Sequence, residues 1–503
     1  MWLLVWPAVF KTVVRDCVSR AGSIPVSLRR LCPRPLVLAS LPSVQVVLRD
    51  PAFCRAAAGL AAPYRTRLVR QVIAGHRQAL RDDHAAGADG LTAAVVAACV
   101  REAEALARPF PRRVVNATGV LIHTNLGRAP LGALLDGLDT RALSGFTELE
   151  WDAERQGRGD RDLALRRQLG LLTGAESALV VNNCASAVLL ALHTLAAGKE
   201  VLVSRGELVE IGGSFRVPDI MAASGCRLRE VGTTNKTRLA DYEAHARRGA
   251  SVLLKVHQAN FVQRGFVEQV ATGELVALGR RLGVPVVEDN GSGLIGEGDA
   301  DAPGTAALAG EPRVTASLTL GVDVVCCSAD KLFGGVQAGF LLGRAECIAA
   351  MRRSPLYRAL RLDKVRIALL DRTLKCYLAG CAGDVPLWRL FHASLDELDA
   401  RLAQLRLPGA DTRWAACRHV ALRATLGGGA NPEVDFPSAG LELQHRDHSA
   451  EEVRRRFAAR AVPVVGYVRQ DRFYLDVRTV LADDLPEVQD ALDALGVPAG
   501  AEG

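Results

Sequence analysis

The feature that most constrains the fold is a pair of apolar segments that each run into a glycine-rich turn. Residues 284–289 end at Asp289 and precede a Gly-Ser-Gly turn, and residues 322–328 are followed by Lys331 and paired glycines. Such apolar runs are typical of strands buried in a parallel sheet. Because the carboxyl ends of parallel strands meet at the edge where ligands bind, Asp289 and Lys331 are predicted to lie together there.

The chemistry of these two side chains indicates one kind of cofactor. The chain has seven lysines beside fifty-five arginines, and only a primary amine can form an imine. A neighbouring carboxylate would keep a pyridine nitrogen protonated, so the pair predicts a pyridoxal 5′-phosphate site in which Lys331 and Asp289 are catalytic and bind the cofactor. Taken singly, Lys331 could lie in a surface turn and Asp289 could cap a helix, but neither alternative explains the pairing.

A third segment is a candidate for binding the cofactor's phosphate. Residues 180–188 run from a strand into an alanine-rich helix. Free backbone amides at the helix start could hold a dianion together with Asn182, Asn183 and Ser186. Helix capping alone would also select these residue types, and the phosphate interpretation is favoured because the other two parts are present.

Other residues near these segments have less specific patterns. Ser328 ends the strand before the lysine turn and is placed with the cofactor-binding residues. His257 follows another apolar strand and could contact the cofactor, although a packed histidine with satisfied nitrogens is slightly favoured. The twelve cysteines lack the spacing of a metal site, so no metal is predicted, and Cys184 and the Cys326-Cys327 pair are expected to be packing thiols.

Four longer strings of the sequence resemble one known family. They are 115–128 (VNATGVLIHTNLGR), 203–213 (VSRGELVEIGG), 230–235 (EVGTTN) and 330–339 (DKLFGGVQAG). All are similar to bacterial selenocysteine synthase, the L-seryl-tRNA(Sec) selenium transferase family. The resemblance covers about residues 39–485.

The resemblance implies an α/β fold-type-I pyridoxal phosphate-dependent transferase, like aspartate aminotransferase, with a small α+β C-terminal domain and a helical N-terminal domain. It implies conversion of L-seryl-tRNA(Sec) to L-selenocysteinyl-tRNA(Sec). The seryl hydroxyl would be eliminated with Lys331 as the base, and selenophosphate would add selenium to the aminoacrylyl group. The expected enzyme is a cytoplasmic homo-oligomer without a membrane partner, at least a dimer and by resemblance a larger ring.

Two alternative functions use the same sequence features. The first is a pyridoxal phosphate-dependent ammonia lyase or β-eliminating enzyme that acts on a small phosphorylated amino acid and needs no tRNA-binding region. The second is a tRNA-binding protein without activity, which is disfavoured because Lys331 and Asp289 are both present.

Arginines are the expected ligands of an anionic selenium donor. Arg128, Arg358 and Arg361 match the family's anion-binding arginines, and a spacing of three is predicted to put the last two on one helix face. The neighbouring arginines 352, 353 and 366 are expected to be solvated. Residues 151–161 resemble the family's glycine-arginine loop near the active site.

The sequence departs from the family's pattern at several positions. These are Asp160, Cys184, Ser186, Asn290 and Val336. None removes a group that the chemistry requires. A carboxylate at position 160 is expected to repel an anionic donor if it faces the pocket.

The domain prediction follows from changes in composition along the chain. Residues 1–38 are interpreted as a disordered extension or an incorrectly assigned start, 39–110 as the helical tRNA-binding domain, 111–364 as the catalytic domain and 365–503 as the small C-terminal domain. Residues 40–113 carry eleven arginines, no lysine and six acidic residues, which suits contacts to tRNA phosphates. A helical bundle with an arginine-rich surface is the alternative.

The predicted C-terminal domain combines helices and short strands. Apolar periodicity predicts helices at 365–378 and 393–405, and alternation predicts strands at 419–426, 440–444 and 472–477. Glycine-rich residues 427–432 are predicted to form a mobile loop.

Overall fold

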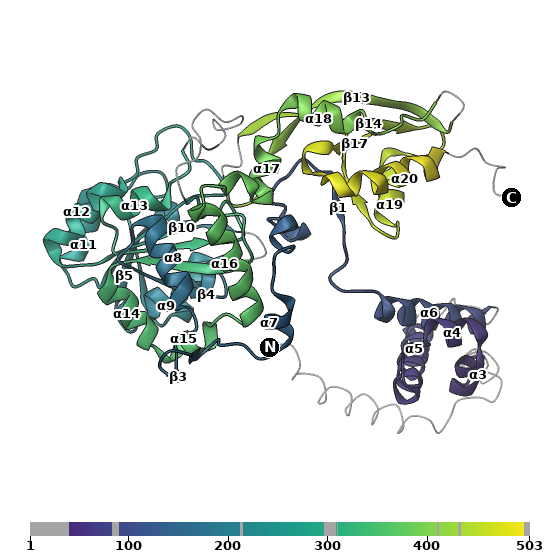
Figure 1. The fold of residues 1–503 in the computed structure, drawn as a ribbon, viewed down its shortest axis with the longest axis horizontal. Helices are drawn as coiled ribbons and strands as arrows, with labels where there is room; N and C mark the ends of the chain where they lie inside the picture. Colours follow the sequence, from purple (N-terminus) through teal and green to yellow (C-terminus); the bar gives the residue numbers. More distant parts are fainter. Residues whose placement is uncertain are drawn as a thin grey trace, which may run out of the picture. The chain divides into compact units, whose positions relative to one another are not determined.

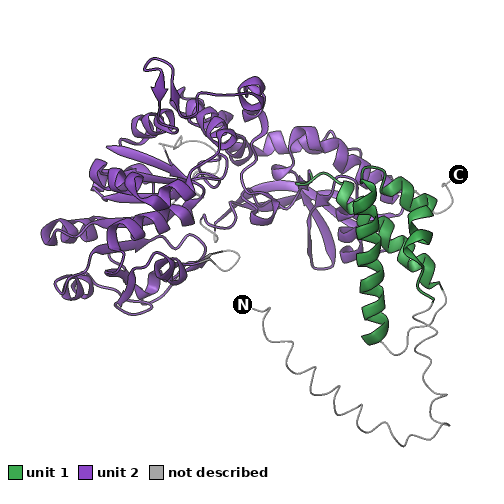
Figure 2. Cartoon of the chain, turned by 90° about the horizontal axis from the view of Figure 1, so that it is seen from below, with its two compact units in different colours: residues 1–112 green, residues 113–503 purple. Residues whose placement is uncertain are grey.

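The computed structural model describes residues 40–82, 90–211, 215–295, 308, 310–409, 412–430 and 434–496. The interpretation of residues 1–38 lies outside the described residues. The chain divides into two compact units, residues 1–112 and 113–503 (Figure 2). No helix in the described part is long and apolar enough to cross a membrane.

The first unit is a small helical domain with its own core. Its helices are α3 (Val44–Arg49), α4 (Pro51–Ala56), α5 (Ala62–Asp82) and α6 (Leu91–Ala107). Ser43 and Asp50 cap the two short helices by accepting hydrogen bonds from first-turn amides. Phe53, Val69 and Val95 are fully buried where three of the helices meet, so the domain is stabilised by apolar packing within itself.

The second unit is built on a seven-stranded sheet (Figure 1). In spatial order its strands are β4 (Ser177–Val181), β12 (Gly339–Gly343), β11 (Val324–Ser328), β10 (Val286–Gly291), β9 (Val252–Val256), β5 (Glu200–Ser204) and β8 (Arg227–Val231). All neighbouring pairs are parallel except those of β12, which runs against both of its neighbours. The strands β4 and β9 to β12 are almost wholly buried, as their continuous apolar runs predict.

Helices cover both faces of this sheet and bury a separate apolar core on each. One core packs under α8 (Leu163–Thr173), α11 (Leu239–Ala246), α12 (Thr272–Leu282), α13 (Val314–Leu320) and α16 (Lys364–Leu378). The other packs under α9 (Cys184–Ala196), α10 (Val217–Ala223), α14 (Ala345–Arg353) and α15 (Pro355–Leu360). This three-layer arrangement places the carboxyl ends of the parallel strands at one open edge.

The C-terminal part forms a second, antiparallel sheet covered by helices. Its strands follow the order β13 (Trp414–Thr425), β14 (Asp435–His445), β17 (Arg472–Asp476) and β16 (Tyr467–Arg469). The helices of this region are α17 (Pro386–His392), α18 (Leu395–Leu402), α19 (Ala450–Ala458) and α20 (Leu485–Gly496). The remaining short elements include β1 (Val115–Asn116), which pairs with β15 (Val464–Val465), α7 (Thr140–Ser144), and the hairpins β2 (Trp151–Asp152) with β3 (Gly157–Arg158) and β6 (Glu210–Ile211) with β7 (Phe215–Arg216).

The α/β large domain, small α+β domain and helical N-terminus that the sequence predicts are confirmed. The predicted helix 365–378 matches α16, and the predicted strands match parts of β13, β14 and β17, although β13 and β17 each end one residue earlier than predicted. The predicted helix 393–405 is shorter, because Ser394 caps α18 from outside its first turn and the helix ends at Leu402.

Candidate active site

Lys331 and Asp289 lie at the same edge of the large sheet, as predicted. The strands β10 and β11 are parallel neighbours with Asp289 opposite Cys326, so the lysine turn begins beside the end of β10. The two residues are only 5 and 6% exposed. Burial raises the pKa of the Asp289 carboxyl, and the positive charge of Lys331 opposes that rise.

The Lys331 turn is fixed by contacts on both sides. The amide of Leu332 donates to the carbonyl of Ser292 at 3.0 Å, which ties the two strand ends together. Gly293 has a φ of +71°, and a Cβ there would collide with the backbone carbonyl of Ser328, so glycine is required. The ring of Phe333 stacks on Tyr377 at a centroid distance of 4.9 Å. The lysine therefore starts from a rigid backbone.

The small domain closes over this lysine. A Cβ built on Gly429, which has a φ of +94°, would lie 2.5 Å from the Nζ atom of Lys331. Gly429 of the glycine-rich loop thus packs against the lysine side chain, and residues 431 and 432 of the predicted loop lie outside the described residues.

These residues fit pyridoxal phosphate. Within the described chain, the buried amine of Lys331 forms no hydrogen bond or ion pair, so it is available to a ligand. The only hydrogen bond to the Asp289 side chain among the described residues comes from the Cys184 thiol at 3.4 Å, which leaves the carboxylate able to accept from a protonated ring nitrogen. Cys184 therefore contacts a site residue in addition to packing.

The predicted phosphate segment lies next to these groups, at the start of α9. The side chain of Asn183 caps the helix by accepting from the Ser186 amide at 2.8 Å, so the capping interpretation holds for Asn183. The amides of Cys184 and Ala185 remain without intrahelical acceptors, as first-turn amides do, and can hold a phosphate. Asn182 is held by a residue outside this segment, because its backbone amide donates to the backbone carbonyl of Leu360 at 3.1 Å.

Ser328 and Arg128 both bind the carboxylate of Asp330. The Ser328 hydroxyl donates at 2.7 Å, and the Nη1 atom of Arg128 lies 3.0 Å from both carboxylate oxygens. Arg128 also has a φ of +62°, a left-handed backbone that is costly outside glycine and is found mainly where the surrounding structure imposes it. Asp330 thus fixes the two side chains directly beside Lys331.

His257 lies at the end of β9 with its backbone amide donating to the Asp289 carbonyl at 2.9 Å. Its Nε2 atom is 3.1 Å from the buried carboxylate of Glu311. One ring nitrogen is therefore paired, as expected for a packed histidine, while the residue still borders the Asp289 strand end.

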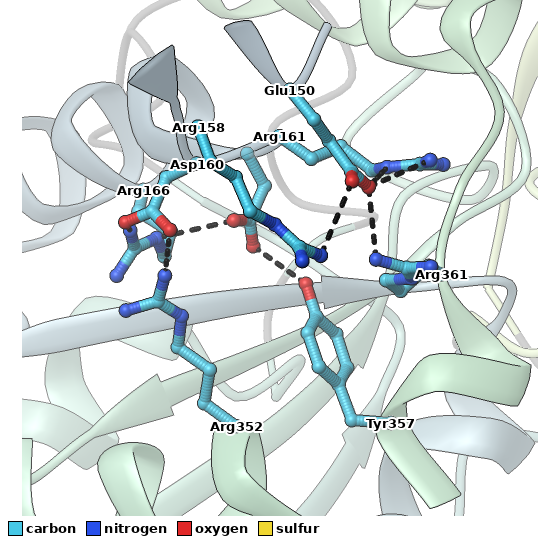
Figure 3. A network of polar contacts seen from close by, with 9 residues as sticks. Glu150, Arg158, Asp160, Arg161, Arg166, Arg352, Tyr357 and Arg361 are labelled. Carbon is cyan, nitrogen blue, oxygen red and sulfur yellow. Dashed lines mark hydrogen bonds and ion pairs between the residues drawn. The ribbon is translucent and has the colours of Figure 1, made fainter. Parts of the chain in front are cut away.

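A cluster of charged side chains surrounds a pocket of about 210 Å³, which is called the arginine pocket. Figure 3 shows the polar contacts among these side chains. Five arginines and three carboxylates line the pocket together with Gly159, Ser354 and Tyr357; the charged residues are Arg158, Arg161, Arg352, Arg358, Arg361, Glu150, Asp160 and Asp162. The pocket adjoins the phosphate segment through the Asn182 contact with Leu360, and the Arg161 side chain donates to the carbonyl of Leu362 at 2.6 Å. It combines excess positive charge with a small volume, which suits a multivalent anion.

Three expectations about the arginines change. Helix α15 ends at Leu360 and Arg361 has an extended backbone, so Arg358 and Arg361 share the pocket but not one helix face. Arg128 does not line this pocket and is held by Asp330 instead. Arg352 is not merely solvated, because it lines the pocket and pairs with Asp160.

Asp160 faces the pocket, yet its charge is already balanced. It forms ion pairs with Arg352 and, at 2.9 Å, with Arg166. Asn290, another departure, is fully buried, and its side chain donates to the Pro312 carbonyl at 2.9 Å and accepts from the Gly293 amide at 3.0 Å. Both departures therefore have polar partners within the structure.

The sequence reasoning missed Glu150, Asp162 and Tyr357. Glu150 binds three arginines (Figure 3). The Tyr357 hydroxyl donates to Asp162 at 3.0 Å. The alternating charges of residues 150–162 were a signal, but Arg361 and Tyr357, which complete the cluster, lie 211 and 195 residues from their partners. The described residues contain no group of three or more histidine, cysteine or acidic side chains able to hold a metal ion.

Comparisons with known proteins identify a family and a related fold. The family model described as L-seryl-tRNA selenium transferase matches residues 114–481. Proteins named L-seryl-tRNA(Sec) selenium transferase are 41% identical over 395 residues in Aquifex aeolicus, covering 78% of this chain and 86% of the relative, and 46% identical over 391 residues in Geobacter sulfurreducens, covering 76 and 83%. The solved structure of D-glucosaminate-6-phosphate ammonia-lyase is similar with a TM-score of 0.52 and 19% identity, covering 76% of this chain and 96% of the other, which shows a shared fold.

Proposed function

This chain belongs to the L-seryl-tRNA selenium transferase family, and from that premise we propose that it converts L-seryl-tRNA(Sec) to L-selenocysteinyl-tRNA(Sec) with selenophosphate as the selenium donor. The observation that carries the proposal is the buried amine of Lys331, which has no partner among the described residues, beside the buried carboxylate of Asp289. An enzyme that eliminates a β-hydroxyl needs an amine that can both bind the cofactor and move a proton.

Pyridoxal phosphate, when bound, supplies an electron sink for negative charge at the seryl Cα atom. Lys331 would hold the cofactor, and its free amine would then accept the Cα proton. Asp289 would keep the ring nitrogen protonated, and the first-turn amides of α9 would hold the phosphate, together with Asn182, Asn183 and Ser186. Ser328 and His257 border this site, where Ser328 acts through Asp330 and His257 orients the end of β10.

The arginine pocket supports the proposed anionic donor. Arg358 forms no hydrogen bond or ion pair within the described part of the chain, and the buried Nε atom of Arg361 has no acceptor. These donors can grip selenophosphate oxygens in pairs. Arg128, paired on one side with Asp330, is the third proposed anion ligand and lies nearer Lys331.

The N-terminal helical unit supports the proposed tRNA partner. On α5, Arg67, Arg70, Arg77 and Arg81 are exposed and recur at helical spacing on one side, whereas Leu68, Val69 and Ile73 are buried. This arginine stripe extends over about 21 Å of helix, which suits successive phosphates of an RNA backbone. We assign residues 39–110 to tRNA binding, 111–364 to catalysis and 365–503 to the domain that closes the site.

The enzyme is further proposed to be a cytoplasmic homo-oligomer, at least a dimer and by family resemblance a larger ring. Phe146 and Trp151 flank the segment that supplies Glu150 and are fully and 53% exposed. Large exposed aromatic side chains are typical of surfaces that a partner covers, and a second copy of the chain is the proposed partner.

The test is transfer of selenium from selenophosphate to seryl-tRNA(Sec) by the purified protein, with Lys331→Ala as the control. Transfer that disappears in the control supports the proposal. A wild-type protein that retains its cofactor absorbance but neither binds the tRNA nor transfers selenium would contradict it and favour a lyase of small phosphorylated substrates. Removal of residues 39–110 is expected to abolish tRNA binding and leave the cofactor absorbance unchanged; loss of that absorbance would mean that the domain is structural.

A further inference from the structure

Glu150 occupies an unusual position in the arginine pocket. Its carboxylate lies 2.9 Å from Arg161, 2.9 Å from Arg361 and 3.5 Å from Arg158 (Figure 3). Partial burial opposes ionisation, but the hydrogen bond from Arg161 and the charges of Arg361 and Arg158 hold the pKa of Glu150 below its ordinary value. One carboxylate therefore serves as the counter-ion of three guanidinium groups.

The other two carboxylates of the pocket have separate partners. Asp160 pairs with Arg166 and Arg352, and Asp162 binds Arg166 and the Tyr357 hydroxyl. Among the described residues, neither carboxylate forms a hydrogen bond or ion pair with Arg361 or Arg358. Glu150 is thus the carboxylate in this pocket that pairs with Arg361, one of the arginines proposed to bind the donor.

The Glu150 side chain can move away from the arginines while its backbone keeps its position. The side chain is 29% exposed, and its carbonyl accepts from the Gly159 amide at 3.0 Å, next to the β2–β3 hairpin. Arg161 would keep its orientation, because its Nη1 atom donates to the Leu362 carbonyl at 2.6 Å. Rotation of one side chain toward solvent would free Arg361 and Arg158 without moving the loop.

We propose that Glu150 is a resident counter-ion of the arginine pocket and that a tetrahedral oxyanion displaces its carboxylate from Arg361 and Arg158. This inference rests on the proposed function, in which the pocket receives the phosphate-like donor. A multivalent oxyanion can bind these two groups together with Arg358, which has no ion pair among the described residues, whereas one carboxylate offers only two oxygens. Glu150 would keep the arginines extended when no anion is bound and would make weak monovalent anions poor competitors.

Inorganic phosphate is the probe, because it has the same tetrahedral oxyanion without the selenium chemistry. Trp151 follows Glu150 directly and is 53% exposed, so its fluorescence reports displacement of the carboxylate, and Trp151→Phe identifies its share of the signal. The holoenzyme is titrated at fixed ionic strength, because screening alone changes the apparent affinity.

Glu150→Gln is expected to bind phosphate about tenfold more tightly than the wild type, because the internal competitor is neutral. Glu148→Gln is the matched control: it removes the same charge two residues away from an exposed side chain, and its affinity is expected to change by less than about twofold. Glu150→Asp keeps the charge but shortens the reach, and is expected to fall between the wild type and Glu150→Gln.

Equal affinity in Glu150→Gln and Glu148→Gln, or weaker binding in Glu150→Gln with an unchanged unfolding temperature, would overturn the inference. If Glu150→Gln does not fold, unchanged phosphate affinity in Glu150→Asp overturns it in the same way. The titration needs no tRNA, so a failure of selenium transfer with the expected phosphate behaviour would remove the proposed function and leave the counter-ion exchange standing.

Discussion

The Lys331 site and the arginine pocket are neighbours that are positioned by different means. Lys331 and Asp289 are placed by the ends of two adjacent buried strands, whose backbone hydrogen bonds and apolar cores fix their direction. The arginine pocket is held by ion pairs among loops and helix ends, and most of its charged side chains are partly exposed. A lysine that moves protons needs the first kind of support, whereas an anion pocket tolerates the second because charges act over longer distances.

The largest expected effect is on selenium transfer in variants of Lys331, the site held by buried strand ends. Lys331→Ala is expected to lower selenium transfer by roughly a thousandfold or more, because it removes the amine that is proposed to hold the cofactor and move the proton. Lys331→Arg should be equally inactive, since it keeps the charge but cannot form an imine. Transfer assays with both variants, at unchanged circular dichroism, measure this; residual transfer within tenfold of the wild type would show that Lys331 is not the catalytic base.

Arg361→Ala tests the electrostatic side. Losing a charged hydrogen bond costs about 1.5 to 3 kcal/mol, so KM for selenophosphate is expected to rise roughly 10- to 100-fold with a smaller change in kcat. Arg353→Ala, an exposed arginine near the end of α14, is the matched control and should leave KM within about twofold. The same KM in both variants would show that the arginine pocket does not bind the selenium donor.

Gly429→Ala asks how closely the small domain controls the lysine. Its Cβ would lie 2.5 Å from the lysine Nζ, so the flexible amine must shift, and transfer is expected to fall about tenfold. Gly380→Ala provides the control, because Gly380 has a similarly positive φ of +72° with nothing within 4 Å of the added Cβ. Equal transfer rates in the two variants would mean that backbone strain, and not displacement of Lys331, causes the loss.

The smallest effect is expected for Asp160→Asn. Its two ion pairs are partly exposed, so the free energy of unfolding should fall by less than about 1 kcal/mol. Because Arg352 and Arg166 lose a counter-ion, the affinity for phosphate should rise slightly, by about twofold. Chemical denaturation and the phosphate titration measure both quantities. A large loss of stability would show that the pocket is as rigid as the lysine site.

How far the sequence could predict the site depends on how each residue is positioned. Asp289 and Lys331 could be predicted because a buried strand followed by glycines indicates where the strand ends and at which edge of the sheet the next side chains lie. The functions of Arg358 and Arg361 came from family resemblance, and helical spacing placed Arg361 wrongly, because Leu360 ends α15. The charges of residues 150–162 signalled an ion-pair cluster around Glu150, but they could not show its contact with Arg361, which lies 211 residues away.

The sequence by itself determined the strand ends and the pairing of an amine with a carboxylate, because apolar periodicity and glycine turns are local consequences of burial and backbone sterics, and its resemblance to a known family indicated the fold class. The tertiary structure alone decided which arginines share a pocket, that Asp160 is neutralised and that Glu150 stands among three guanidinium groups. Charges choose partners by distance in space, and fifty-five arginines give the sequence too many equivalent choices.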